Sequence, residues 1–236
     1  MNSISIFGVF VADLCFFGNK IPTRGETVLG NNHLVGPGGK GSNQAIAAAR
    51  LEGNVKFITK IGKDSHAEMA LSLYKEVGVN TGSIIQDPSL STGVAGIMID
   101  ENGHNAINIV AGAAGHLQNI DIDKNLDVIK DSKIFLTQME TPDLTTMYAL
   151  KKAKENNCLT ILNPAPARKI KKEDFDMTQM RDKFKARSNK YIEGVFLDED
   201  PKELFPAINE IAYNVSEEGK NTMNACYWLE WIMEFE

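Results

Sequence analysis

The stretch GPGGKGSNQA at residues 36–45 decides the predicted fold of this 236-residue chain. Its glycines bracket a single lysine, Lys40, and an alanine-rich segment at 45–51 follows at once. A turn of glycines lets backbone N–H groups approach a ligand without interference from a Cβ atom. A helix that begins there directs its free N–H groups and the positive end of its dipole to the same place. We therefore expect a turn that holds a small, oxygen-rich ligand; the alternative is a tight strand-to-helix turn without a ligand.

Two side chains add polar groups to this expected cradle. Lys40 supplies a mobile positive charge, and Asn43 supplies an amide that can both donate and accept hydrogen bonds. The spacing differs from a P-loop, in which four residues separate the first glycine from Gly-Lys-Ser/Thr. No Gly-x-Gly-x-x-Gly follows the first predicted strand either, which argues against a nucleotide-binding oxidoreductase.

Strand-like and helix-like segments alternate along the first two thirds of the chain. We predict strands at 4–9, 55–61, 83–85, 133–138 and 159–162, and helices at 43–51, 65–77 and 144–155. Strands separated by helices of this length imply right-handed crossovers and a mostly parallel sheet covered on both faces. The fold class is therefore α/β with three layers.

Two segments, residues 14–35 and 92–110, alternate apolar and polar residues without a helix between them. The sequence Asp-Glu-Asn-Gly at 100–103 lies between strand-like runs at 96–99 and 106–109, which predicts a hairpin. These segments predict a small, separate β-sheet that projects from the main layer.

Composition indicates an ordinary cytoplasmic protein. The net charge of −6 argues against a nucleic-acid partner, which needs clustered basic residues. No apolar run approaches the roughly 20 residues that span a membrane, and the N-terminus lacks the pattern of a signal peptide. The three cysteines lack metal-ligand spacing and are expected to be reduced thiols: Cys15, Cys158 and Cys226.

Five motifs occur in an order that resembles the ribokinase family of sugar kinases. They are Asp13, Gly-Glu-Thr-Val at 25–28, the glycine-rich run at 38–45, Gln-Met-Glu-Thr-Pro at 138–142 and Asn-Pro-Ala-Pro-Ala-Arg at 163–168. The resemblance covers about residues 4–170. It implies a ribokinase-like fold whose small sheet is a lid over the sugar, a homodimer contact through that lid, and phosphorylation of ribose to ribose 5-phosphate by Mg-ATP with a monovalent cation.

The same resemblance implies a set of sugar-binding residues: Asp13, Gly39, Lys40, Gly41, Asn43 and Glu140. From chemistry alone, Asp13 follows a strand at the edge where open α/β sheets bind ligands, and its carboxylate can accept hydrogen bonds from two sugar hydroxyls. Taken singly, Asp13 could be a turn residue and Glu140 a solvated loop acid. The prolines at 164 and 166 could shape the strand exit or contact the ligand.

The chain departs from the family pattern at two positions of the sugar site. Val11 and Ala114 stand where the family usually has asparagine. A site built for hydroxyls loses about 1–3 kcal/mol for each polar partner left unpaired. We therefore expect sugar affinity or preference to differ from that of an ordinary ribokinase.

A larger departure follows residue 170. The family's late Asp-Thr-x-Gly-Ala-Gly-Asp motif, whose glycines form an anion hole and whose last aspartate is the base, has no counterpart there. The family's nucleotide, magnesium and cation segments are also not found, so the catalytic base is unknown and no metal ligand is assigned. We predict a sugar-binding half with its lid at 1–170 and a divergent, mainly helical tail at 171–236, with helices at 198–215 and 222–236.

Two hypotheses follow from this pattern. The first is a ribokinase-like carbohydrate kinase that is impaired or incomplete in this chain. The second is a non-catalytic sugar-binding remnant, from truncation or fusion.

Overall fold

The computed structural model describes residues 3–163, 165–166 and 196–197. A six-stranded sheet forms the centre, in the order β10-β9-β8-β1-β4-β5. Its strands are β1 (Ser3–Phe7), β4 (Asn54–Ile61), β5 (Ile84–Gln86), β8 (Ile134–Gln138), β9 (Leu159–Asn163) and β10 (Phe196–Leu197). All neighbouring strands of this sheet pair in parallel except β10, which pairs with β9 in antiparallel fashion. The predicted, mostly parallel sheet is confirmed.

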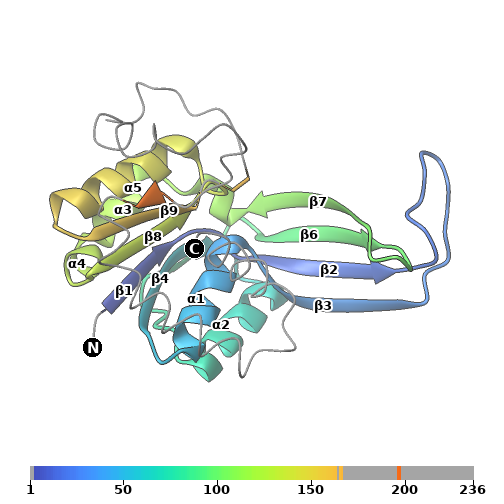
Figure 1. The fold of residues 1–236 in the computed structure, drawn as a ribbon, viewed down its shortest axis with the longest axis horizontal. Helices are drawn as coiled ribbons and strands as arrows, with labels where there is room; N and C mark the ends of the chain where they lie inside the picture. The colour runs from blue at the N-terminus through green and yellow to red at the C-terminus, as the bar shows by residue number, and fades with distance from the viewer. Residues whose placement is uncertain (1–2, 164, 167–195, 198–236) are drawn as a thin grey trace, which may run out of the picture.

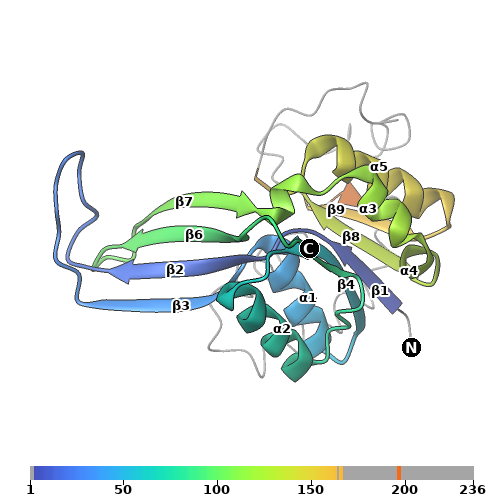
Figure 2. The ribbon, with the colours of Figure 1, turned by 180° about the vertical axis from the view of Figure 1, so that it is seen from behind.

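Helices cover both faces of this sheet (Figures 1 and 2). On one face lie α1 (Lys40–Arg50) and α2 (Ser65–Val77). On the other lie α3 (Asn119–Lys124), α4 (Leu126–Lys130) and α5 (Asp143–Glu155). Each face has its own cluster of buried apolar side chains, so the predicted three layers are present.

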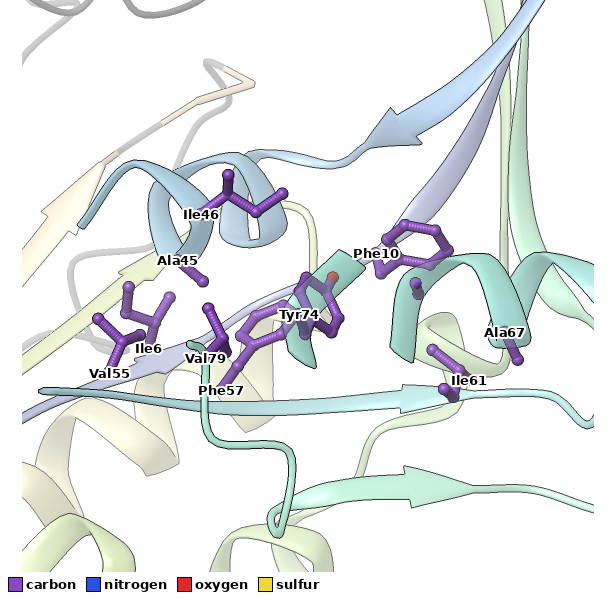
Figure 3. Close-up of a cluster of buried hydrophobic side chains, with 11 residues drawn as sticks. Ile6, Phe10, Ala45, Ile46, Val55, Phe57, Ile61, Ala67, Tyr74 and Val79 are labelled. Atoms are coloured by element: carbon purple, nitrogen blue, oxygen red, sulfur yellow. The ribbon is translucent and has the colours of Figure 1, made fainter. Parts of the chain in front are cut away.

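The cluster beneath α1 and α2 centres on Tyr74, whose side chain is fully buried (Figure 3). The rings of Phe10 and Phe57 meet it edge to face, at centroid distances of 6.1 and 5.5 Å. The Tyr74 hydroxyl donates a hydrogen bond of 2.8 Å to Ser42 Oγ, in the first turn of α1. This buried contact fixes the start of α1 against α2.

A second sheet of four strands extends from the central one (Figure 1). Its order is β3-β2-β6-β7, from β2 (Val11–Phe17), β3 (Asn32–Gly38), β6 (Thr92–Ile99) and β7 (Asn105–Gly112). The predicted hairpin joins β6 to β7, with Asp100 N donating to His104 O at 3.0 Å and Gly103 at φ +82°. The sheet begins earlier than predicted, so Asp13 lies within a strand rather than before it.

The base of the second sheet is bonded to the end of β4 and the loop that follows. Asp64 Oδ2 accepts the N–H of Thr92, the first residue of β6, at 2.7 Å. The buried Lys60 ammonium donates to Asp121 Oδ2 at 2.7 Å and to the carbonyl of His116, just beyond β7, at 3.1 Å. Both ends of the β6–β7 hairpin are thereby attached to one segment of the central layer.

The prediction differs from the structure in a few elements. Helix α1 begins at Lys40 rather than at residue 43, and the short helices α3, α4 and η1 (Ala113–His116) were not predicted. Strand β10 was not predicted either, and the tail helices proposed at 198–215 and 222–236 lie outside the described residues. Within the described ranges, no helix is long and apolar enough to cross a membrane.

Candidate functional site

The glycine-rich turn leads from β3 into α1 and requires glycine at two positions. Gly39 precedes the helix at φ +91°, and a Cβ atom there would lie 2.5 Å from the carbonyl oxygen of Val9. A Cβ atom on Gly38 would lie 2.0 Å from Asp13 Oδ1. The turn is therefore shaped so that the Asp13 carboxylate can lie directly against the backbone before α1.

Glu140 meets the first residue of α1. Its Oε2 accepts the backbone N–H of Lys40 at 2.7 Å, which uses one of the free N–H groups at the start of the helix. Glu140 is placed there because β8 ends at Gln138 and the following loop runs toward α1. Burial raises the pKa of the Glu140 carboxyl, while the Lys40 N–H and the Lys40 charge oppose that rise.

Asp13 reaches the same place from the second sheet. Burial, and then the negative charge of Glu140, raise the pKa of Asp13 to about 6. Its neighbours across the strands are small, Gly36 on β3 and Ala95 on β6. The structure therefore brings together the Asp13 carboxylate of the second sheet and the Glu140 carboxylate of the loop after β8, with the N-terminus of α1 beside them.

The two remaining predicted residues lie in the first turn of α1. Gly41 packs on the backbone of Gly8, where a Cβ atom would come within 2.7 Å of the Gly8 Cα, so close packing accounts for this glycine. Asn43 is partly buried, and its N–H donates to the carbonyl of Gly39 at 2.9 Å. Asn43 therefore lies in the same helical turn as Lys40.

The two positions where the resemblance led us to expect asparagine are apolar and buried. Val11 is 3% exposed and Ala114 is fully buried. In the motif at 163–168, Asn163 ends β9 opposite Gln138. Residues 164 and 167–168 of that motif lie outside the described residues.

Sequence reasoning did not foresee the role of a pair of glutamines beneath the site. Gln138 is 1% exposed, and its Nε2 donates to Gln44 Oε1 on α1. Gln138 belongs to the Gln-Met-Glu-Thr-Pro motif at 138–142, but no sequence signal connects it to Gln44. The contact depends on how α1 crosses the end of β8.

Metal-ligating side chains do not gather in the residues that the structure describes. In this part of the chain no group of three or more His, Cys, Asp or Glu side chains lies close enough together to hold one. Magnesium and a monovalent cation, which the resemblance implies, are therefore not assigned to any residue of the site.

Comparison with known proteins decides the family. The model of the pfkB family carbohydrate kinases matches residues 1–175. The chain belongs to this family. Among its relatives, the deoxyribokinase of Salmonella typhi is 35% identical over 164 residues, covering 70% of this chain and 54% of the relative. The ribokinase of Bacillus subtilis is 36% identical over 176 residues, covering 75% of this chain and 60% of the relative.

Solved ribokinase structures agree with the fold. The ribokinase from Thermotoga maritima has a TM-score of 0.66 and 35% identity, with 74% of this chain and 56% of that chain covered. The Arabidopsis thaliana ribokinase complexed with ribose and ATP has a TM-score of 0.64 and 28% identity, with 70% and 54% covered. This pfkB-family chain spans about half the length of the curated relatives that it matches.

Proposed function

We propose that this chain binds a pentose between Asp13, Glu140 and the N-terminus of α1, as the sugar-binding part of a ribokinase-like kinase. The reaction proposed is the phosphorylation of ribose at its 5-hydroxyl to ribose 5-phosphate. One observation carries the proposal: a carboxylate of the second sheet, Asp13, and one of the loop after β8, Glu140, meet at a glycine-rich helix start, where Glu140 Oε2 lies 2.7 Å from Lys40 N.

The chemistry of these groups suits a neutral polyhydroxyl ligand. Carboxylates accept hydrogen bonds from adjacent hydroxyls, while the Asn43 amide and the Lys40 ammonium can donate to ring or hydroxyl oxygens. Two neighbouring carboxylates repel an anion, and the charge of Glu140 already disfavours ionisation of Asp13. An unphosphorylated sugar therefore fits the site better than a sugar phosphate does.

The second sheet serves as a lid in this proposal. The face that carries Asp13 also carries three apolar residues that are more than half exposed, Leu34, Ile107 and Ile109. Closure over a sugar excludes water from the site. A homodimer contact through the same sheet would cover these side chains.

ATP, with magnesium and a monovalent cation, is the proposed phosphoryl donor, supported by the ribokinase relative whose structure was solved with ribose and ATP. The late family motif that would supply the base and the anion hole is not found in residues 171–236. We therefore place the sugar-binding unit at 1–170 and expect phosphoryl transfer to be impaired or incomplete. The protein is proposed to be cytoplasmic. The second candidate, a non-catalytic sugar-binding remnant, is favoured by the same missing motif.

Two measurements test these proposals together. Calorimetry measures binding of ribose and 2-deoxyribose, and a coupled assay measures ADP release with ribose, Mg-ATP and potassium. Binding with ribose-dependent ADP release supports the kinase. Binding without ADP release supports the remnant. A folded chain that binds neither sugar would overturn the proposed site.

A further inference from the structure

Beneath the proposed site, the buried Gln138 and the partly buried Gln44 join the end of β8 to α1. Gln138 Nε2 donates to Gln44 Oε1. Gln138 Oε1 lies against two glycine backbones: a Cβ atom on Gly8 would come within 2.3 Å of it, and one on Gly41 within 3.0 Å. The amide of Gln138 therefore occupies a slot that exists because both positions are glycine.

This pair carries a cost that an apolar pair would avoid. Gln138 Oε1 and Gln44 Nε2 are buried atoms that have no hydrogen-bond partner among the residues that the structure describes. A buried polar atom without a partner destabilises a fold, whereas replacing both partners by apolar groups of similar shape can be nearly neutral. Stability alone therefore does not account for the two amides.

The location of the pair indicates what it does. Gln138 precedes Glu140 by two residues, and Gln44 follows Lys40 by one helical turn. The bond from Gln138 to Gln44 and the 2.7 Å bond from Lys40 N to Glu140 thus join the same two elements, one behind the other. The Gln138–Gln44 contact thus sets the distance and orientation between α1 and the end of β8 that the bond from Lys40 N to Glu140 needs.

We infer that Gln138 is a positioning residue: through Gln44, it holds α1 against the end of β8 so that Glu140 reaches the Lys40 N–H and lies beside Asp13. The consequence for sugar affinity rests on the proposed function. The consequence for the charge around Asp13 does not, because Glu140 acts on that carboxyl in the absence of any ligand.

The test uses the full chain with Gln138→Leu, Gln44→Leu and both together. Thr59→Val is the matched control, because Thr59 is fully buried and its Oγ1 also has no partner within the described part of the chain, but it lies on β4. We expect the double variant to unfold in urea as cooperatively as the parent. In NMR titrations without sugar, the pKa of Asp13 should fall from about 6 as Glu140 moves away. Affinity for ribose and 2-deoxyribose should fall at least tenfold, while Thr59→Val changes neither quantity.

An unchanged Asp13 titration together with unchanged sugar affinity in the double variant would overturn the inference. If the parent chain binds neither sugar, the proposed function fails, and the ligand-free titration still decides the role of Gln138. If the leucine pair does not fold, methionine at both positions, which matches glutamine in length, undergoes the same measurements.

Discussion

The backbone nitrogen of Lys40 lies 2.7 Å from Oε2 of Glu140, a residue one hundred positions later in the chain. This bond joins the first turn of α1 to the loop after β8, and it places a negative charge at the positive end of a helix. Asp13 then enters from the second sheet, beside that charge. The candidate site is thus assembled from three elements that are distant in sequence.

Replacing Asp13 tests the sugar site most directly. Asp13→Ala removes a carboxylate that can accept two hydroxyl hydrogen bonds, each worth about 1.5–3 kcal/mol when one partner is charged. We expect calorimetry to detect no sugar binding. Asp100→Ala is the control, because Asp100 lies at the far hairpin turn of the same sheet, where it accepts hydrogen bonds from Asn102 and His104. Equal affinity in the two variants would contradict the assignment.

The stability of the chain should depend on pH through Asp13. Its pKa is raised from the ordinary 3.8 to about 6 in the folded protein, so its contribution to stability is fully present below about pH 4 and is lost as the pH rises to about 6. Because Asp13 is only partly buried, we expect its contribution to the free energy of unfolding to be about 1–2 kcal/mol.

Urea unfolding of the parent and of Asp13→Asn between pH 3.5 and 7 isolates this contribution, because an amide cannot ionise. As the pH rises from 4 to 6, the unfolding free energy of the parent should fall relative to that of Asp13→Asn. Parallel curves would show that Asp13 titrates normally.

Two glycines with positive φ separate backbone strain from crowding. Gly39 has φ +91°, and a Cβ atom there would lie 2.5 Å from Val9 O. Gly103 has φ +82°, and a Cβ atom there would have no atom of the described residues within 4 Å. Gly103→Ala should cost about 1–2 kcal/mol, from the backbone conformation alone. Gly39→Ala should cost more than about 3 kcal/mol, because the turn must also move. Similar midpoints in urea for both variants would contradict the crowding at Gly39.

The buried ion pair of Lys60 and Asp121 should be sensitive to loss of one partner. Lys60→Met leaves a buried carboxylate without its cation and should cost about 3–5 kcal/mol. Lys130→Met removes the exposed Lys130–Asp127 pair at 3.5 Å and should cost less than about 1 kcal/mol. Denaturant unfolding compares them, and equal losses would mean that the buried pair does not stabilise the base of the second sheet.

Local signals account for what the sequence predicts well. Helix α2 spans Ser65–Val77, as predicted, because Asp64 accepts the N–H of Ala67 at its start and Gly78 adopts a left-handed conformation at its end. Helices α3 and α4 were missed because they have 6 and 5 residues, too few for a periodic pattern. Buried contacts such as Lys60 with Asp121 hold that region in place.

In the candidate site, too, some features have local signals in the sequence and others depend on tertiary packing. Asp13 and Glu140 follow predicted strands, so their meeting at one edge of the fold could be anticipated. That Asp13 would belong to a strand of the second sheet, and that Gln138 would contact Gln44, depends on the angle between packed elements. No pattern along the chain encodes that angle.

If a ligand binds at the proposed site, the position of Asp13 on β2 makes the second sheet a thermodynamic participant in that binding. Lys40 lies on α1 and Glu140 in the loop after β8, so a ligand that contacts all three residues binds fully in one orientation of the second sheet relative to these elements. By linkage, any contact that holds the second sheet in that orientation raises ligand affinity by some factor, and the ligand strengthens that contact by the same factor. A surface remote from the carboxylates can thus set how tightly they bind.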